Sequence, residues 1–137
     1  MNMPEELDVL IQQTRKAREY AHAPYSNFKV GAGLQASDGR VFTGCNVENA
    51  TYGLTVCAER VAIFKAVSEG VSTFSRIVIV AATDDLTPPC GACRQMIWEF
   101  CGDIPVTLVN LEGKMESFQM AELFPRPFDL SYLKQNK

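Results

Sequence analysis

Two short segments of the sequence bring thiols and a carboxyl group together in a pattern suited to metal chemistry. The first is Cys57-Ala58-Glu59-Arg60, and the second is Pro89-Cys90-Gly91-Ala92-Cys93. Each follows a loop and opens a predicted helix, where backbone N–H groups and the helix dipole favour a thiolate over a thiol. Because Cys90 and Cys93 are three residues apart, they project to the same side of a first helical turn and can chelate one ion.

Three thiolate ligands and an open fourth position are typical of a catalytic zinc ion, whereas structural zinc sites usually have four protein ligands. We therefore expect Cys57, Cys90 and Cys93 to hold one Zn²⁺, which lowers the pKa of bound water and supplies hydroxide at neutral pH. Glu59 lies two residues after Cys57, where its carboxyl group can move protons. A cysteine or histidine two residues before a glutamate, followed by Pro-Cys-x-x-Cys, is the known signature of zinc deaminases.

Three thiolates leave the zinc site with a net negative charge, which opposes the ionisation of bound water. The two predicted helix N-termini supply part of the compensating positive field. Arg60 or Arg94 could supply the rest by donating hydrogen bonds to thiolate sulfurs. We favour Arg60, because it directly follows the catalytic glutamate, and expect Arg94 to lie at the surface.

The elements that must position these residues alternate between helical and apolar, strand-like segments. Hydrophobic periodicity and turn signals predict helices at 5–22, 57–69, 90–100 and 120–123, and strands at 28–36, 41–46, 76–82, 106–110 and 114–119. This order predicts an α/β fold, a three-layer α/β/α domain around a central mixed five-stranded sheet, in which residues 1–137 form a single domain. Gly31 and Gly33 in the first strand predict that another element approaches closely there.

Composition excludes several classes of protein. The 137 residues carry a net charge of −3 and no basic cluster of the kind that grips nucleic acid. No apolar run is long enough for a membrane span, and the acidic start is unlike a secretory signal, so we expect a cytoplasmic protein. The odd number of cysteines argues against a disulfide framework. Cys45 and Cys101 are expected to be inert buried thiols, and His22 lies outside every motif.

Further motifs in the same order strengthen the zinc assignment. Tyr25-Ser26-Asn27-Phe28-Lys29-Val30-Gly31-Ala32, then Asn46-Val47-Glu48-Asn49-Ala50, precede the two cysteine segments. Together they resemble the small cytidine deaminases of pyrimidine salvage, from Pro24 to Phe128. The resemblance implies zinc-dependent hydrolysis of cytidine and 2′-deoxycytidine to uridine and 2′-deoxyuridine plus ammonia, with zinc-bound hydroxide attacking C4 and Glu59 shuttling protons.

The resemblance also implies substrate contacts. Asn46 and Glu48 match a pair that binds the ribose, Glu48 through the 3′-hydroxyl, and Phe28 matches an aromatic residue that packs on the base. The backbone N–H of Ala58 is expected to meet the 2-oxo group. The carbonyl of Pro88 is expected to accept a hydrogen bond from the 4-amino group.

The three-cysteine form resembles the homotetrameric branch of this family. Phe128 matches an aromatic residue of the tail that enters a neighbouring subunit's site, and Tyr52 matches a residue near subunit contacts. Departures from the family pattern are small: Pro88 stands where serine or threonine is usual, and Gly33 where alanine is common. Arg126-Pro127 before Phe128 is also unusual, so the path of the tail is left open.

Three alternatives stay open at this point. A deaminase that edits a base within RNA or DNA usually has histidine in place of Cys57 and needs a basic groove. A relative that acts on another aminopyrimidine nucleoside, such as blasticidin S, is disfavoured by Asn46-Val47-Glu48-Asn49. A non-enzymatic zinc-stabilised binding module would need a fourth protein ligand.

Overall fold

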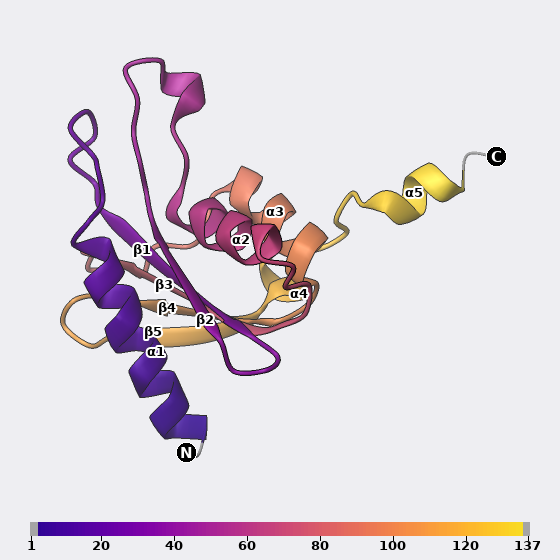
Figure 1. Cartoon of the computed structure of the whole chain (residues 1–137), viewed down its shortest axis with the longest axis horizontal. Coiled ribbons are helices and arrows are strands. Elements are labelled where there is room, and N and C mark those ends of the chain that lie inside the picture. Colours follow the sequence, from indigo (N-terminus) through magenta and orange to yellow (C-terminus); the bar gives the residue numbers. More distant parts are fainter. Residues whose placement is uncertain (1–2, 136–137) are drawn as a thin grey trace.

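The computed structural model describes residues 3–135, which contain a five-stranded mixed sheet with helices on both faces (Figure 1). The strands are β1 (Val30–Ala36), β2 (Val41–Cys45), β3 (Phe74–Ala81), β4 (Pro105–Val109) and β5 (Met115–Gln119). Across the sheet they run in the order β2-β1-β3-β4-β5, and β3 and β4 pair in parallel while the other neighbours are antiparallel.

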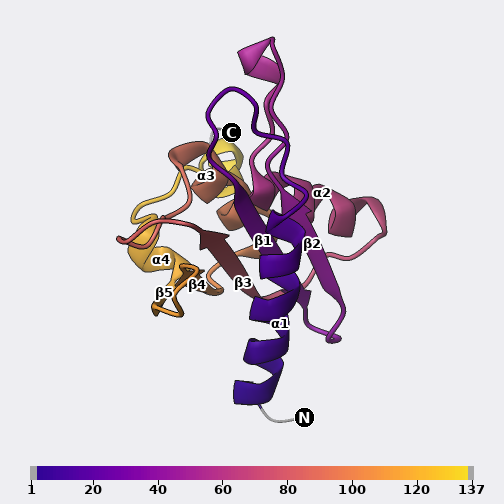
Figure 2. The ribbon, with the colours of Figure 1, turned by 90° about the vertical axis from the view of Figure 1, so that its left-hand side faces the viewer.

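Alternate residues of the strands face two separate helical layers. Helix α1 (Met3–Arg18) covers one face, where Leu10 packs with Val78 and Val80 of β3. Helices α2 (Ala58–Ser68) and α3 (Gly91–Cys101) cover the other face, where Ile77 and Ile79 lie in the larger buried cluster (Figure 2). The predicted three-layer α/β/α fold with a mixed five-stranded sheet is therefore confirmed.

The glycines of β1 allow α1 to lie directly on the sheet. A Cβ atom added at Gly33 would stand 2.0 Å from Thr14 Oγ1, and one added at Gly31 would stand 2.5 Å from the carbonyl oxygen of Thr14. Both distances are far below van der Waals contact. The expected close approach is thus made by α1, whose buried Thr14 fills the space left by the missing side chains.

The first helix is shorter than its apolar pattern predicts. It ends at Arg18, and the prediction that it reaches His22 is wrong. The N–H of His22 donates to the carbonyl of Asn46 at 3.0 Å, and its own carbonyl accepts from the N–H of Glu48 at 2.8 Å. These extended-chain hydrogen bonds compete with helix continuation, and they hold residues 22–28 beside the strand end that carries Asn46 and Glu48.

Three short elements complete the described chain. The predicted helix α4 is present at Met120–Leu123, whereas the 3₁₀ turn η1 (Tyr52–Leu54) and helix α5 (Leu130–Lys134) were not predicted. In Figure 1, α5 extends away from the layers of the sheet and helices. Within residues 3–135, no helix has the length and apolar character needed to cross a bilayer.

Candidate active site

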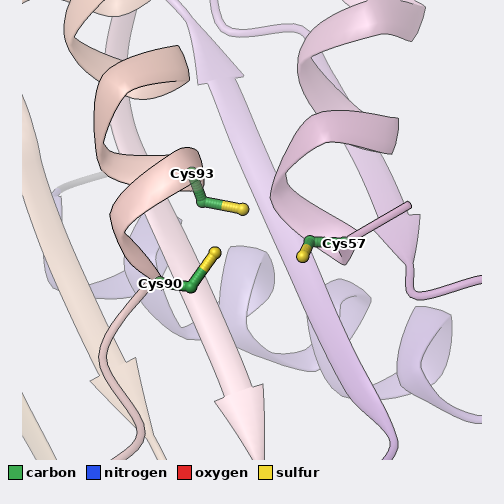
Figure 3. A group of neighbouring side chains, drawn as sticks. All are labelled: Cys57, Cys90 and Cys93. Carbon is green, nitrogen blue, oxygen red and sulfur yellow. The ribbon is translucent and has the colours of Figure 1, made fainter. Parts of the chain in front are cut away.

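Three thiols converge where α2 and α3 begin side by side. Cys57 and Cys90 occupy the N-cap positions of α2 and α3, and Cys93 lies in the first turn of α3. Their sulfur atoms all lie within 4.8 Å of one another and face a common point (Figure 3). Cys93 is buried, Cys57 is half-buried and Cys90 is exposed, so the cluster opens to one side.

The donor set fits zinc. Ligands at the usual zinc–sulfur distance of about 2.3 Å stand about 3.8 Å apart in a tetrahedral site, and the sulfur separations within 4.8 Å are compatible with that arrangement. Thiolate is the ligand type that zinc prefers, and three thiolates leave one coordination position for a non-protein ligand. The cluster therefore fits one zinc ion per chain.

Hydrogen bonds within the cluster prepare one thiol for ionisation. The Cys93 thiol and the Arg60 guanidinium donate toward the sulfur of Cys57, which lowers the pKa of Cys57 to about 5. The hydrogen bond to Cys57, together with burial, raises the pKa of Cys93. Since zinc binds thiolates, loading of the site must release the proton that the two thiols share.

Glu59 lies at the base of the same site, in the first turn of α2. It is only 5% exposed and lines the pocket together with Cys57 and Cys90. Burial raises the pKa of the Glu59 carboxyl, and the neighbouring Cys57 thiolate adds to this shift. A carboxyl group whose pKa is raised holds a proton more readily, which suits a group that must accept and return protons.

Arg60 and Arg94 have different surroundings. One Nη atom of Arg60 lies 3.5 Å from the sulfur of Cys57 and 3.4 Å from the carbonyl oxygen of Thr55. Arg94 instead donates to the carbonyls of Pro89 at 2.8 Å and Leu123 at 2.6 Å, so it ties the loop before α3 to α4. Arg94 is half-buried by this tie rather than fully exposed, and none of its hydrogen bonds within residues 3–135 goes to a cysteine sulfur.

A pocket of about 330 Å³ opens over the cluster. It contains every predicted substrate contact of a single chain: Phe28, Asn46, Glu48, Ala58 and Pro88. Sequence reasoning missed other lining residues, namely Ser26, Val30, Thr55, Ile79 and Thr87. Ser26 and Thr55 lie within or next to motifs that were recognised, but nothing in their spacing indicates which way their side chains point.

The pair expected to bind ribose is already held by the backbone. The Asn46 amide oxygen accepts from the N–H of Val30 at 2.8 Å, and its NH₂ donates to the carbonyl of Phe28 at 2.7 Å. Glu48 accepts from the N–H groups of Tyr25 at 2.9 Å and Ser26 at 3.1 Å, and from the Ser26 hydroxyl. The hydrogen bonds from Ser26 lower the pKa of Glu48, which keeps this carboxylate a hydrogen-bond acceptor.

Two aromatic residues expected at subunit contacts lie outside this pocket. Phe128 is 60% exposed and stacks on Tyr132 of α5, with 5.9 Å between ring centroids. Tyr52 is 74% exposed and packs edge-on against Tyr25, also at 5.9 Å. Each ring has one aromatic neighbour in its own chain but stays mostly exposed, so both are available to a neighbouring molecule.

The other two cysteines are remote from the metal cluster. Burial raises the pKa of Cys101 to about 12, and burial also raises the pKa of Cys45. Both thiols are therefore protonated at neutral pH and poorly nucleophilic. All five cysteines of the chain are free thiols.

Comparison with known proteins identifies the family. The model of the cytidine and deoxycytidylate deaminase zinc-binding region matches residues 4–108, which include both cysteine segments. A cytidine deaminase of Sporosarcina psychrophila is 52% identical over 131 residues, covering 93% of this chain and 96% of the relative. A cytidine deaminase of Halalkalibacterium halodurans is 50% identical over 121 residues, covering 88% of this chain and 92% of the relative.

A solved structure agrees with these sequence matches. The crystal structure of a cytidine deaminase from Burkholderia pseudomallei superposes with a TM-score of 0.87 at 45% identity, covering 93% of this chain and all of that chain. Fold, zinc-binding region and overall length thus agree with one group of enzymes. This chain belongs to the family of cytidine and deoxycytidylate deaminases.

Proposed function

We propose that this chain is a zinc-dependent hydrolase that converts cytidine and 2′-deoxycytidine to uridine and 2′-deoxyuridine with release of ammonia. The observation that carries the proposal is the buried Glu59 carboxyl group, which lines one pocket together with Cys57 and Cys90. A volume of about 330 Å³ suits one nucleoside. The relatives named cytidine deaminase, which match most of the chain, support the same substrate.

Cys57, Cys90 and Cys93 would hold the metal, which supplies Lewis-acid activation of water when it is bound. Glu59 takes a proton from the attacking water and delivers it to N3 of the pyrimidine. It then takes the second proton and passes it to the amino group on C4, which leaves as ammonia. The raised pKa of Glu59 suits a group that must both gain and lose a proton in each turnover.

The substrate contacts follow from the groups that line the pocket. Ala58 is the first residue of α2, so its N–H lacks an acceptor within the helix, which supports its assignment to the 2-oxo group of the pyrimidine. We assign the carbonyl of Pro88 to the 4-amino group and the ring of Phe28 to the face of the base. Asn46 and Glu48 are assigned to the ribose, with Glu48 accepting from the 3′-hydroxyl.

Arg60 is assigned to charge compensation. Its guanidinium contacts the sulfur of Cys57, so its positive charge reduces the electron density that this thiolate donates to the metal. A less electron-rich zinc is a stronger Lewis acid and activates water more effectively. Arg94 is excluded from this role because its hydrogen bonds go to Pro89 and Leu123.

We further infer that the chain works as a homotetramer whose sites are completed by neighbouring subunits. Phe128 and Tyr52 are exposed aromatic residues, and exposed aromatic residues are enriched at protein interfaces. Tyr52 and Tyr25 line a second hollow that shares Ser26, Glu48 and Thr55 with the candidate active site. An aromatic ring from a neighbouring chain that enters this hollow would lie beside the ribose.

The cellular setting is part of the proposal. Five free thiols, three of them in a metal cluster, suit the reducing cytoplasm better than an oxidising compartment. With free nucleosides as substrates, we assign the enzyme to pyrimidine salvage, with residues 1–137 acting as one catalytic domain.

The test is an absorbance assay with zinc-loaded wild-type protein and the Glu59→Gln variant, each analysed for zinc. Wild type is expected to remove the cytidine absorbance, while Glu59→Gln keeps its zinc and loses about 100- to 10,000-fold in kcat. Glu69→Gln, at the exposed end of α2, is the matched control. A Glu59→Gln protein that keeps both zinc and full turnover would overturn the mechanism.

The same assay separates the alternatives. Cytidine should be consumed faster than blasticidin S, and an oligonucleotide that contains cytosine should be left unchanged. A folded, zinc-loaded protein that binds cytidine without converting it would favour the non-enzymatic binding module. Faster conversion of blasticidin S would show that cytidine is not the preferred substrate, but it would not contradict the proposed deamination mechanism.

A further inference from the structure

One hydroxyl group lies between two of the proposed substrate contacts. The Ser26 hydroxyl donates a hydrogen bond to Oε2 of Glu48 and accepts one from the backbone N–H of Phe28 at 3.0 Å. A serine hydroxyl can donate and accept at the same time, so it can join two groups that do not contact each other directly. Glu48 and Phe28 both line the pocket over the metal cluster.

The remaining hydrogen bonds of Glu48 come from the same segment. Its Oε1 atom accepts from the backbone N–H groups of Tyr25 and Ser26, at 2.9 and 3.1 Å. These two bonds hold one oxygen, while the Ser26 hydroxyl holds the other. Without that hydroxyl the carboxylate would be fixed at a single oxygen and could rotate about it.

A tight turn brings Phe28 back to Ser26. Asn27 has a φ of 56°, in the left-handed region, which asparagine tolerates better than most residues. Its N–H donates to the carbonyl of Ala23 at 3.0 Å, which closes the turn. The backbone of Phe28 is held a second time by the Asn46 amide, which donates to its carbonyl. The ring of Phe28 therefore starts from a backbone that is anchored on both sides.

We propose that Ser26 is a positioning residue that holds Glu48 and Phe28 in one arrangement before the nucleoside binds. The inference rests on the proposed function, because it assigns Glu48 to the ribose and Phe28 to the base. Preorganised contacts bind more tightly because less conformational entropy is lost on association. Ser26 has no hydrogen bond to Glu59 or to the three cysteines among the described residues, so its effect falls on binding and leaves the chemical step unchanged.

The first experiment measures kcat and KM for cytidine in Ser26→Ala, together with zinc content and Tm. We expect KM to rise about 5- to 10-fold, as for the loss of one hydrogen bond of ordinary net strength, with kcat within about twofold of wild type. Ser37→Ala, in the exposed turn between β1 and β2, is the control and should match wild type. A Ser26→Ala protein with unchanged KM, or with kcat lowered as much as kcat/KM, would overturn the inference.

A matched pair keeps the test valid if the alanine variant folds poorly. Ser26→Thr retains the hydroxyl and should have a KM close to that of wild type. Ser26→Val has nearly the same shape as Ser26→Thr but no hydroxyl, so its KM should be raised as in Ser26→Ala. Equal KM values for the two variants would contradict a role for the hydroxyl group.

The second experiment uses 3′-deoxycytidine, which lacks the hydroxyl group assigned to Glu48. The rise in KM caused by Ser26→Ala should be smaller with this nucleoside than with cytidine, because only the effect on Phe28 is left. An equal rise with both nucleosides would show that Ser26 does not act through Glu48. Wild-type protein without cytidine turnover would overturn the proposed function and this inference together, whereas normal turnover with an unaffected Ser26→Ala would overturn the inference alone.

Discussion

The start of helices α2 and α3 and the segment that follows α4 differ in how firmly their functional residues are held. Cys57, Cys90 and Cys93 come from two helices that pack on the central sheet, and the side chain of Cys93 is fully buried. Phe128 is 60% exposed. Its neighbourhood is tied to α3 by hydrogen bonds from Gln95 to the Phe128 carbonyl and from Trp98 to Asp129.

The difference separates the groups proposed for the chemistry from the part of substrate binding that is proposed to depend on the tail. The metal ligands and Glu59 are brought together within one chain, in positions that the packed layers hold in place. The exposed ring of Phe128 has no comparable packing in its own chain. Changes at the cluster should therefore remove zinc and turnover, whereas changes in the tail should alter substrate binding alone.

The largest expected effect is that of Cys93→Ala. Loss of this buried ligand should reduce zinc content to well below one ion per chain and lower kcat by about 1000-fold or more, because water at neutral pH is then no longer activated. Zinc analysis and the cytidine absorbance assay measure both effects. Cys45→Ala, which removes a thiol remote from the cluster, should keep its zinc. Full zinc content in Cys93→Ala would show that this cysteine is not a ligand.

Arg60→Gln should have a smaller effect at the same cluster. Removing a group that hydrogen-bonds to a metal ligand typically lowers metal affinity or activity about 10- to 100-fold, and Arg60 contacts the sulfur of Cys57. The measurements are kcat and a zinc competition titration with a chelator. Arg40→Gln, on the exposed β1–β2 turn, is the control. Wild-type values for both quantities would remove Arg60 from the proposed mechanism.

Phe128→Ala tests the tail. We expect KM for cytidine to rise about 10-fold, equivalent to about 1.4 kcal/mol, because a buried aromatic anchor at an interface contributes at least this much. Zinc content should be unaffected, because the three thiols lie at the start of α2 and α3 and not in the tail. Leu133→Ala, at an exposed position of α5, is the comparison variant. Unchanged kinetics in a Phe128→Ala tetramer would contradict a shared site.

Gly33→Ala probes the layer farthest from the chemistry and should have the smallest effect on catalysis. The added methyl group collides with Thr14 Oγ1, so we expect a loss of about 1–3 kcal/mol of stability with KM and zinc content unchanged. Thermal unfolding measures the loss. Gly53→Ala, where an added Cβ meets nothing within 4 Å, is the control.

A double variant sharpens the same test. Thr14→Ala removes the hydroxyl against which the new methyl group would press. The loss of stability in Thr14→Ala/Gly33→Ala should therefore be smaller than the sum of the losses in the two single variants. Additive losses of stability would show that the two positions do not compete for the same space.

Most of the fold followed from local patterns, and the errors have a common cause. The strand predicted at 76–82 within a three-layer fold is present as β3, and the structure has helices on both sides of it. The extension of α1 to His22 failed because His22 pairs with Asn46 and Glu48, which lie more than twenty residues further along the chain. Periodicity reports local preference, and a distant partner for the backbone can override it.

In the candidate site, too, the sequence predicted local relations between residues better than contacts between distant ones. The choice of Arg60 over Arg94 was made from its position next to Glu59, and in the structure Arg60 contacts Cys57. Ser26 was missed as a contact of Glu48, because that hydrogen bond joins residues 22 positions apart. Thr87 was missed as well, since a residue in a loop gives no periodic signal of where its side chain points.

By itself, the sequence determined which chemical groups are present and how they are spaced along each helix. Cys57 and Glu59 are two residues apart, so the short chain between them keeps them close, and the helical repeat brings Cys90 and Cys93, three apart, to one side. Only the tertiary structure decided that α2 and α3 begin next to each other, because their meeting depends on burial of both helices against β1, β3 and β4. The same packing decided the shape of the pocket and left the ring of Phe128 mostly exposed, since both depend on where residues far apart in the chain come to lie.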